Sequence, residues 1–497
     1  MQGREVLFSD FSGNKYTRKE ALIYYFYLKR QIDDHNAPIA FLCNNSIDSH
    51  TVSFFLILSR YKVYFLNSSS LNSESIKSLS LEGIINVISI GKDEVKNGLL
   101  SQLSLPLKFI NLPTIDNLLK WSHPSLDLAK AWHEYSQDKI GNSIFMSSGS
   151  TGTPKLIPLT YNQIRTCYNN VCSGFLHSSS YELIISVHDT SFVISLPFLF
   201  CFSAKPSSIM SACSYPLQEI AVLALSRYIK SVTNYLIISV PSVYRLMISL
   251  LGSDAGIAFK NQSLISCGEP LDWDLAGSIS GCNPRDFFNL YGTTEVSPWI
   301  IYLDVLDFLK SNLDVYTPIL PAGRPLPNVH LEISTENELL VSSGSNFSGY
   351  INHSNETTFI EIEDVNYYNT GDLFELKNDL FFCNGRSNNA IKIAGVFVNP
   401  MLVEASLKTQ LLNMNLLVLA DPKKAKLSIV AFQDVDSPAL ADKQSLLSLI
   451  RKTINTIVSK SIPINLIVDN KEEMIYLKSG NLDRNHYFKK HIQAHDH

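Results

Sequence analysis

The sequence has 497 residues, of which 45% are hydrophobic and 18% are charged. This length exceeds that of one ordinary domain, and the composition is that of a globular protein with a large core. The net charge of -5 and the isoelectric point near 6.2 argue against the basic surface by which proteins bind nucleic acid or anionic membranes.

The N-terminal segment, MQGREVLFSDFSGNKYTRKEA, lacks the basic stretch followed by an apolar run that marks a secretory signal. The uncharged run Thr190–Ala204 is interrupted by Pro197 and is too short to span a bilayer, so we interpret it as a buried strand with its exit loop. None of the eight cysteines has CxxC spacing, which favours buried, reduced thiols over a zinc or redox site. The sequence therefore predicts a cytoplasmic protein without membrane insertion.

The first part of the chain alternates helical and strand-like segments. Ala21–Gln31 has the composition of a helix, and Ile39–Asn45 and Val63–Ser70 are apolar runs that end in polar turns. The same alternation recurs between Ser143 and Glu295. It predicts an α/β fold with parallel strands.

Three apolar segments in this second part end in Gly, Pro or Ser turns, and we expect each to be a strand: Phe192–Pro197, Tyr235–Pro241 and Ser263–Pro270. In open α/β sheets ligands bind beyond the carboxyl ends of the strands, so these turns are candidate site segments.

After Ile319 the pattern changes to short segments with alternating polar and apolar residues, which indicates a β-rich part. From Asn388 the chain contains two strand-like runs, Leu416–Ala420 and Leu427–Phe432, and a helical run, Lys443–Lys460. That content predicts a small α+β domain at the C-terminus.

The strongest motif is SSGSTGTPK, in which an apolar run leads into a loop of small hydroxyl residues and glycines that ends on a lysine. Glycines let the backbone approach an anion, consecutive N–H groups and hydroxyls donate to it, and the lysine adds a positive charge. The loop is not a Walker motif, because Leu156 stands where that motif needs Ser or Thr. We predict that it binds a polyphosphate through Ser147, Ser148, Gly149, Ser150, Thr151, Gly152 and Lys155.

This loop resembles the phosphate-binding signature of the adenylate-forming superfamily, which includes acyl-CoA and aryl-CoA ligases, luciferases and the adenylation domains of peptide synthetases. Further segments resemble the other motifs of that superfamily in the same order. The stronger matches are Asn289–Glu295 (NLYGTTE), Tyr368–Asp372 (YNTGD) and Gly385–Pro400, and the weaker ones are Cys267–Leu271, Pro321–Pro327 and Glu338–Tyr350.

The resemblance implies a role for each residue of these motifs. Thr294 is expected to contact phosphate, Glu295 to ligate Mg²⁺, Tyr291 to lie along the adenine, Asp372 to accept both ribose hydroxyls and Arg386 to reach the ribose or phosphate. A lone carboxylate suits a metal ion that phosphate oxygens already bridge. The other nucleotide-binding residues it implies are Gly268, Glu269, Pro270, Gly292 and Thr293.

The resemblance also implies an activity and a fold. The activity is activation of a carboxylic acid by ATP and Mg²⁺ as an acyl-AMP, followed by transfer to the thiol of CoA or of a carrier protein. The fold is α/β: residues 1–387 form two layered α/β subdomains with a small β-rich subdomain, and residues 388–497 form a mobile α+β domain that rotates about Asn388.

One motif departs from the superfamily. The final block usually has a catalytic lysine after Ser-Gly, whereas here Asn481 follows Ser479 and Gly480. Loss of such a transition-state donor costs on the order of 3–4 kcal/mol. Three interpretations remain: Lys478 replaces the lysine through a shifted loop, adenylation runs slowly without it, or the chain binds nucleotide without catalysis.

The acyl pocket of the superfamily is lined by three segments, which correspond here to Leu196–Ser203, Ser266–Pro270 and Leu290–Val296. An Asp that would hold a substrate ammonium is not found in the first segment, and an unpaired ammonium is costly to bury. We therefore expect an acyl or aryl acid rather than an amino acid. The candidate pocket residues are Phe198, Phe200, Cys201, Cys267 and Gly292.

Overall fold

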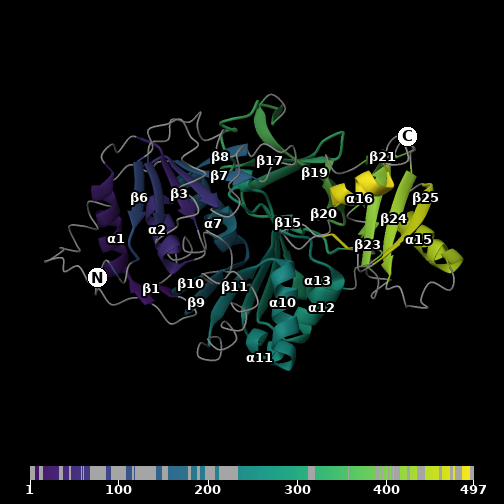
Figure 1. Ribbon diagram of the computed structural model, residues 1–497, viewed down its shortest axis with the longest axis horizontal. Coiled ribbons are helices and arrows are strands. Elements are labelled where there is room, and N and C mark those ends of the chain that lie inside the picture. The colour runs from purple at the N-terminus through teal and green to yellow at the C-terminus, as the bar shows by residue number, and fades with distance from the viewer. Residues whose placement is uncertain are drawn as a thin grey trace.

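The computed structural model describes the chain in segments: residues 6–9, 15–32, 37–43, 46–57, 59, 61–67, 86–90, 108–114, 117, 142–147, 155–176, 181–186, 191–195, 208–211, 233–311, 319–355, 358–387, 391–393, 396–400, 403–404, 407, 415–421, 426–433, 443–457, 462–470, 474–475 and 484–492. Their strands form two large sheets, a smaller β-rich sheet and, in the C-terminal part at one end of the molecule, a two-stranded and a three-stranded sheet (Figure 1).

The first large sheet has six strands in the order β6, β5, β3, β4, β7, β8, and all its pairs are parallel except the β7–β8 pair. Helix α7 follows β8 directly, because the side chain of Thr160 accepts a hydrogen bond from the N–H of Gln163 and the Gln163 side chain caps Thr160 in return. The strands are β3 (Ile39–Cys43), β4 (Val63–Asn67), β5 (Asn86–Ile90), β6 (Lys108–Leu112), β7 (Asn142–Ser147) and β8 (Lys155–Thr160); the helices are α1 (Arg18–Gln31), α2 (Ile47–Ile57) and α7 (Tyr161–Val171), which a π-helical turn, Cys172–Leu176, extends.

The second large sheet has nine strands in the order β15, β14, β13, β12, β11, β9, β10, β1, β2, and the pairs from β13 to β1 are parallel. Its strands are β1 (Val6–Ser9), β2 (Lys15–Thr17), β9 (Leu183–Ser186), β10 (Ser208–Ser211), β11 (Tyr235–Ser239), β12 (Ser263–Cys267), β13 (Asp286–Tyr291), β14 (Ile301–Asp304) and β15 (Arg324–Pro325). The helices that accompany it are α10 (Pro241–Leu251), α11 (Ala255–Phe259), α12 (Trp273–Gly281) and α13 (Val305–Lys310), with 3-10 turns at Val193–Ser195, Gly252–Asp254 and Thr294–Val296.

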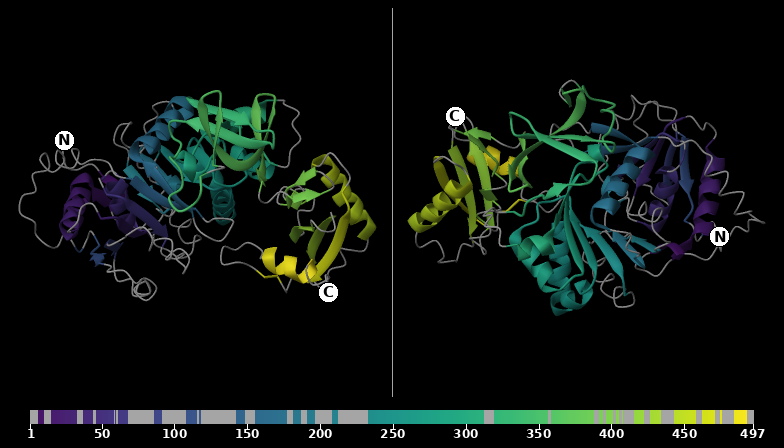
Figure 2. Two further views of the ribbon diagram at one scale, coloured as in Figure 1. Left: turned by 90° about the horizontal axis from the view of Figure 1, so that it is seen from above. Right: turned by 180° about the vertical axis from the view of Figure 1, so that it is seen from behind.

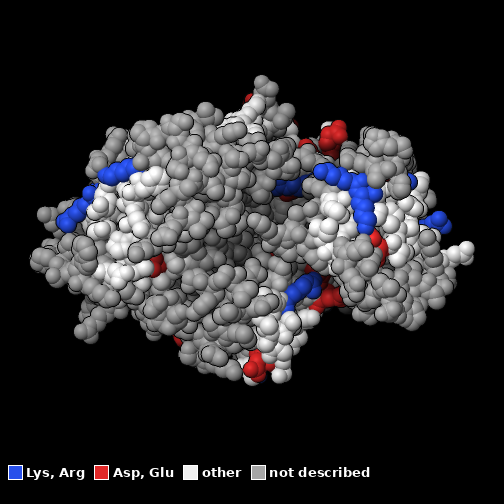
Figure 3. Space-filling view, in the orientation of Figure 1, with Lys and Arg blue, Asp and Glu red and all other residues white. Residues whose placement is uncertain are grey.

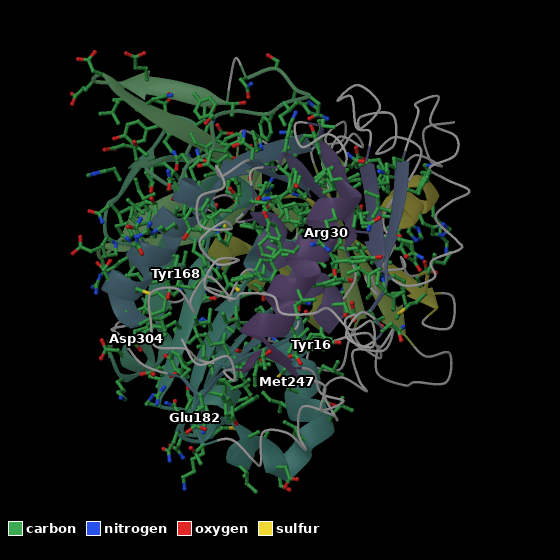
Figure 4. All side chains as sticks on the ribbon, turned by 90° about the vertical axis from the view of Figure 1, so that its left-hand side faces the viewer. Tyr16, Arg30, Tyr168, Glu182, Met247 and Asp304 are labelled. Atoms are coloured by element: carbon green, nitrogen blue, oxygen red, sulfur yellow. The ribbon has the colours of Figure 1, made fainter. Side chains whose placement is uncertain are left out.

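Alternate residues of the parallel strands pack into two different cores. Leu236 and Ile238 of β11 belong to the core shared with the six-stranded sheet, whereas Tyr235 and Ile237 face the helices α10 and α12. Tyr168 and Met247, labelled in Figure 4, lie in the first and second of these cores. Both faces of the sheet are therefore buried, which explains the continuous apolar runs in its sequence.

The β-rich part is an antiparallel sheet above the junction of the two large sheets (Figure 1). Its strands are β16 (Val329–Ile333), β17 (Glu338–Ser343), β18 (Phe359–Ile362), β19 (Val365–Lys377) and β20 (Leu380–Arg386). The long strand β19 pairs with β17 and β18 over its first half and with β20 over its second. The second half of β19 includes Asp372, whose side chain contacts a residue of the nine-stranded sheet.

The C-terminal part lies at one end of the molecule (Figures 1 and 2). Its elements are β21 (Ile391–Ile393), β22 (Val396–Val398), β23 (Asn415–Asp421), β24 (Lys426–Gln433), α15 (Lys443–Ile457), β25 (Ile464–Asn470) and α16 (Arg484–His491). Two core clusters, one including Ile450 of α15 and one including Tyr487 of α16, cover opposite faces of the β23–β24–β25 sheet. The prediction of a domain boundary at residue 388, and of domain mobility, stays a prediction.

The structure confirms the predicted α/β fold and most of its strands, but residues 192–195, the described part of the predicted strand Phe192–Pro197, are not a strand. Val193–Ser195 forms a 3-10 turn, and the side chain of Phe192 is 54% exposed. Strand β9 already has β10 and β11 as its two neighbours, so the sheet has no free edge there for another strand. An uncharged run therefore specifies neither the backbone conformation nor, at Phe192, burial of the side chain.

Within the described segments, the helices are too short or too polar to cross a membrane. On the face shown in Figure 3, the charged side chains of the described residues are scattered and both signs occur together.

Candidate nucleotide site

A row of polar side chains crosses three parallel strands at their carboxyl ends. Ser239 of β11 is the register partner of Ser266 of β12, which in turn is the partner of Asn289 of β13. All three residues are buried. Among the described residues, the two serine hydroxyls and the amide oxygen of Asn289 find no hydrogen-bond partner. Buried polar atoms are rarely left unpaired, so this row has free capacity to bind a polar ligand or water.

Tyr291, two residues beyond Asn289, connects this sheet to the β-rich part. Its hydroxyl donates a hydrogen bond of 2.5 Å to Oδ2 of Asp372 in β19. The other carboxylate oxygen, Oδ1, lies 2.9 Å from Nε of Arg386 at the end of β20. Asp372 and Arg386 are also register partners in the β19–β20 pair. The three predicted site residues therefore form one group.

Burial controls the ionisation of this group. It raises the pKa of the Asp372 carboxyl above its usual 3.8, although Arg386 and the hydrogen bond from Tyr291 oppose the shift. Burial, together with the charge of Asp372, holds the pKa of Tyr291 well above its usual value, so this hydroxyl is a hydrogen-bond donor at neutral pH. For Arg386, burial acts to lower the pKa, but the carboxylates of Asp372 and Glu295 outweigh it and leave the pKa raised.

Glu295 and Lys155 meet through a tyrosine that the sequence did not single out. Glu295 is buried in the 3-10 turn after β13, and its Oε1 accepts a hydrogen bond of 2.8 Å from the hydroxyl of Tyr350. The ammonium of Lys155, the first residue of β8, lies 4.6 Å from the centre of the Tyr350 ring. The charge of Glu295 also raises the pKa of Asp372, after burial, which places both groups in one electrostatic site.

Gly292 and Gly268 are required by close packing and by backbone geometry. A Cβ atom on Gly292 would overlap the backbone carbonyl of Pro298. Gly268 has φ +78°, a conformation that residues with a Cβ rarely adopt. Both glycines therefore shape the turns at the carboxyl ends of β12 and β13.

Two of the other predicted residues have structural partners. The carboxylate of Glu269 accepts hydrogen bonds of 2.9 Å from the N–H and the hydroxyl of Ser242, so it caps helix α10, where Val240 provides no side-chain cap. Cys267 is fully buried, and its thiol lies 3.7 Å from the carbonyl oxygen of Ser239. Pro270 is exposed beside Glu269.

The hydroxyl of Thr293 is buried beside the phenol of Tyr368 and, among the described residues, meets no partner at hydrogen-bonding geometry. Thr294 begins the turn that contains Glu295 and is partly exposed. Thr293 and Thr294 lie between Tyr291 and Glu295 in the chain, and their hydroxyls can form hydrogen bonds with a ligand.

The remaining predicted residues lie outside the part of the chain that the structure describes. For Ser147 the backbone at the end of β7 is described, and this residue is the register partner of Lys155. The segment between Ser147 and Lys155 therefore connects the end of β7 to the start of β8 at the same end of this antiparallel pair. Outside the described residues are Ser148, Gly149, Ser150, Thr151, Gly152, Phe198, Phe200, Cys201, Asn388, Lys478 and Asn481.

The site has the chemistry to hold a nucleotide and a divalent cation. Among the described residues Oε2 of Glu295 accepts no hydrogen bond, and one carboxylate oxygen suits a metal that phosphate oxygens also ligate. Each oxygen of Asp372 has a further lone pair that could accept a ribose hydroxyl. Sequence reasoning did not name Ser239, Ser266, Asn289 or Tyr350 as site residues, although all four lie within segments or motifs that it recognised.

A family model described as AMP-binding enzyme matches residues 42–351. The chain belongs to this family. It is thereby a member of the adenylate-forming superfamily, as its motifs predicted.

The relatives found by sequence and by structure comparison are named as ligases. The chain is 25% identical to the D-alanine--D-alanyl carrier protein ligase of Lactococcus lactis over 60% of the chain and 58% of the relative. It is 24% identical to the enzyme of the same name from Listeria monocytogenes over 69% of the chain and 68% of the relative. The matched regions thus cover 58% and 68% of the length of these two curated relatives.

Among solved structures, the chain is similar to that of the anthranilate CoA ligase AuaEII in complex with anthranoyl-AMP. The TM-score is 0.74 at 15% identity, over 99% of this chain and 95% of the other. At this identity the likeness shows a common fold.

We predict that Gly292→Ala destabilises the protein by about 1–3 kcal/mol, because the added methyl group meets backbone atoms that can move only with their chain. Chemical denaturation measures the loss. The matched control is Gly277→Ala in α12, where a Cβ meets nothing within 4 Å and helix propensity favours alanine. Equal stability of Gly292→Ala and wild type would contradict the close contact with Pro298.

The raised pKa of Asp372 predicts a pH dependence of stability. A carboxyl with a raised pKa takes up its proton more readily in the folded state, so its contribution is fully present below pH 3.8 and is lost as the pH rises through the folded pKa. Asp372→Asn is neutral throughout and should lack this slope. Relative to wild type, the free energy of unfolding of the variant should therefore increase from below pH 3.8 towards neutral pH; a constant difference would contradict the shift.

Proposed function

We propose that this protein activates a carboxylic acid with ATP and Mg²⁺ as an acyl-AMP and then transfers the acyl group to a thiol. The observation that carries the proposal is the convergence of Lys155, Tyr291, Glu295, Asp372 and Arg386 around Tyr350 and Tyr368. These residues come from four strands of three sheets and from one turn, and together they supply the cation, carboxylates and phenols that can bind a nucleoside triphosphate and its metal ion.

Each group has a distinct part in the proposed reaction. Asp372, oriented by Tyr291 and Arg386, accepts the ribose hydroxyls, which positions the α-phosphate. Lys155 offsets phosphate charge, and Glu295 provides a ligand for Mg²⁺. The metal supplies charge neutralisation of the triphosphate when bound. The substrate carboxylate can then attack the α-phosphate, forming the acyl-phosphate bond as the bond to pyrophosphate breaks.

For the acid we propose an acyl or aryl acid, since the first pocket segment lacks an Asp for an ammonium. Two curated relatives carry names that specify D-alanine and a carrier protein, so a small amino acid delivered to a carrier-protein thiol is the second candidate. Pyrophosphate release across a panel containing aryl acids, short acyl acids and D-alanine separates these substrates. ATP binding without acid-dependent pyrophosphate release would instead favour the nucleotide-binding, non-catalytic alternative.

Glu295→Gln should lower Mg²⁺-dependent adenylation on the order of a hundredfold, because the amide cannot replace the charge of a metal ligand. Binding of a preformed acyl-AMP should change far less, since no triphosphate must then be neutralised. Pyrophosphate release and acyl-AMP binding measure the two effects. Glu332→Gln on the exposed side of β16 is the matched control. Equal losses in both assays would argue against a metal-binding role.

Two further variants decide which residue serves in place of the usual lysine. If Asn481 faces the site, Asn481→Lys should raise the adenylation rate by restoring a cation near the α-phosphate, on the order of a hundred- to a thousandfold. Thioester formation from supplied acyl-AMP should change little. If Lys478 already supplies the charge, Lys478→Ala should abolish adenylation and Asn481→Lys should help little or hurt through like-charge repulsion. Unchanged pyrophosphate release in both variants would show that this loop does not serve the chemistry.

A further inference from the structure

Tyr350 contacts both charged residues that are proposed to handle the triphosphate and its metal. Its hydroxyl donates to Oε1 of Glu295 at 2.8 Å, and its ring faces the ammonium of Lys155 at 4.6 Å. Tyr350 and Glu295 are buried, so this geometry is formed in a region of low dielectric. One side chain thus contacts both the Lys155 ammonium and the Glu295 carboxylate.

The backbone around Tyr350 is bonded to the segments that carry both partners. The N–H of Ile351 donates to the carbonyl of Leu156, and the N–H of Leu156 donates to Oδ1 of Asn352, which joins this loop to the start of β8 beside Lys155. On the other side, the N–H of Phe347 donates to the carbonyl of Glu295 at 2.7 Å. The loop from 347 to 352 therefore links the strand of Lys155 to the turn of Glu295.

Tyr350 itself is held by its neighbours. Asn355 accepts a hydrogen bond of 2.8 Å from the N–H of Tyr350 and donates one to its carbonyl. The rings of Phe347 and Tyr350 pack edge to face, with centres 4.8 Å apart. Burial, followed by the charge of Glu295, raises the pKa of Tyr350 well above its usual value, so its hydroxyl keeps the proton that it donates.

We propose that Tyr350 is a positioning residue that fixes the Lys155 ammonium and the Glu295 carboxylate in one relative arrangement, and through them the polyphosphate and its divalent cation. This inference rests on the proposed function. The hydroxyl bond occupies Oε1 and orients Oε2 for the metal, while the negative face of the ring holds the ammonium. The two contacts are separable, because phenylalanine retains the ring without the hydroxyl.

The test is the Mg²⁺ dependence of ATP binding, measured by titration calorimetry on the full chain. Tyr350→Phe should raise the half-saturating Mg²⁺ concentration about tenfold, as expected for loss of a hydrogen bond to a charged group. Binding of AMP without metal should stay unchanged, because it uses Tyr291, Asp372 and Arg386. Tyr350→Leu should also weaken ATP binding a further severalfold through loss of the ring beneath Lys155. Tyr367→Phe, which removes the hydroxyl of a buried tyrosine next to Tyr368 on β19, is the matched control.

A double-variant cycle separates positioning from structural support. If the hydroxyl acts through Glu295, Tyr350→Phe in a Glu295→Gln background should change the half-saturating Mg²⁺ concentration by less than about twofold. Two results would overturn the positioning role and leave the proposed function standing. One is an unchanged Mg²⁺ dependence of ATP binding in Tyr350→Phe. The other is an equal loss of AMP and ATP binding in that variant, together with a lower melting temperature. If wild type binds neither AMP nor ATP and releases no pyrophosphate, the proposed function fails, and this inference fails with it.

Discussion

The hydrogen bond between Tyr291 and Asp372 is the contact on which the candidate site depends. Tyr291 ends a strand of the nine-stranded sheet, whereas Asp372 lies in the long strand β19 of the β-rich part, 81 positions further along the chain. The bond fixes the place where the carboxyl ends of the parallel strands meet a second sheet. Arg386 and Glu295 belong to segments adjacent to these two residues, so their positions follow from the same junction.

Two buried carboxylates at this junction require compensation, because a charge removed from water is expensive unless it is paired. Arg386 pairs with Asp372, and phenol hydroxyls from Tyr291 and Tyr350 donate to Asp372 and Glu295. Burial raises the pKa of both tyrosines, so they remain neutral donors and add no negative charge. The aromatic residues that surround the site therefore have an electrostatic function in addition to packing.

The sequence predicted the strands well where both faces of a sheet are buried, as in Tyr235–Ser239 and Ser263–Cys267, because a continuous apolar run between turns has few other interpretations. It was wrong at residues 192–195, because composition could not reveal that strand β9 already has a neighbouring strand on each side. Motif resemblance named Tyr291, Asp372 and Arg386 as nucleotide-binding residues, and the structure brings their side chains into contact, while their role stays a prediction. It did not indicate Tyr350 as their partner, since a contact between Tyr350, Lys155 and Glu295 depends on how three distant segments pack.

The pairing of charges also bears on the missing lysine. Arg386 is already paired with Asp372, so its positive charge offsets a carboxylate of the protein before any nucleotide arrives. If the protein binds a triphosphate as we propose, Lys155 and a metal ion held by Glu295 are the groups of the described part of the site that would offset its charge. In the proposed reaction, the neutral Asn481 of the last motif would make stabilisation of the transition state depend more heavily on the accurate placement of Lys155 and of the metal ion. Because Tyr350 contacts both, we expect the substitution at Asn481 to increase the sensitivity of this protein to changes at Tyr350.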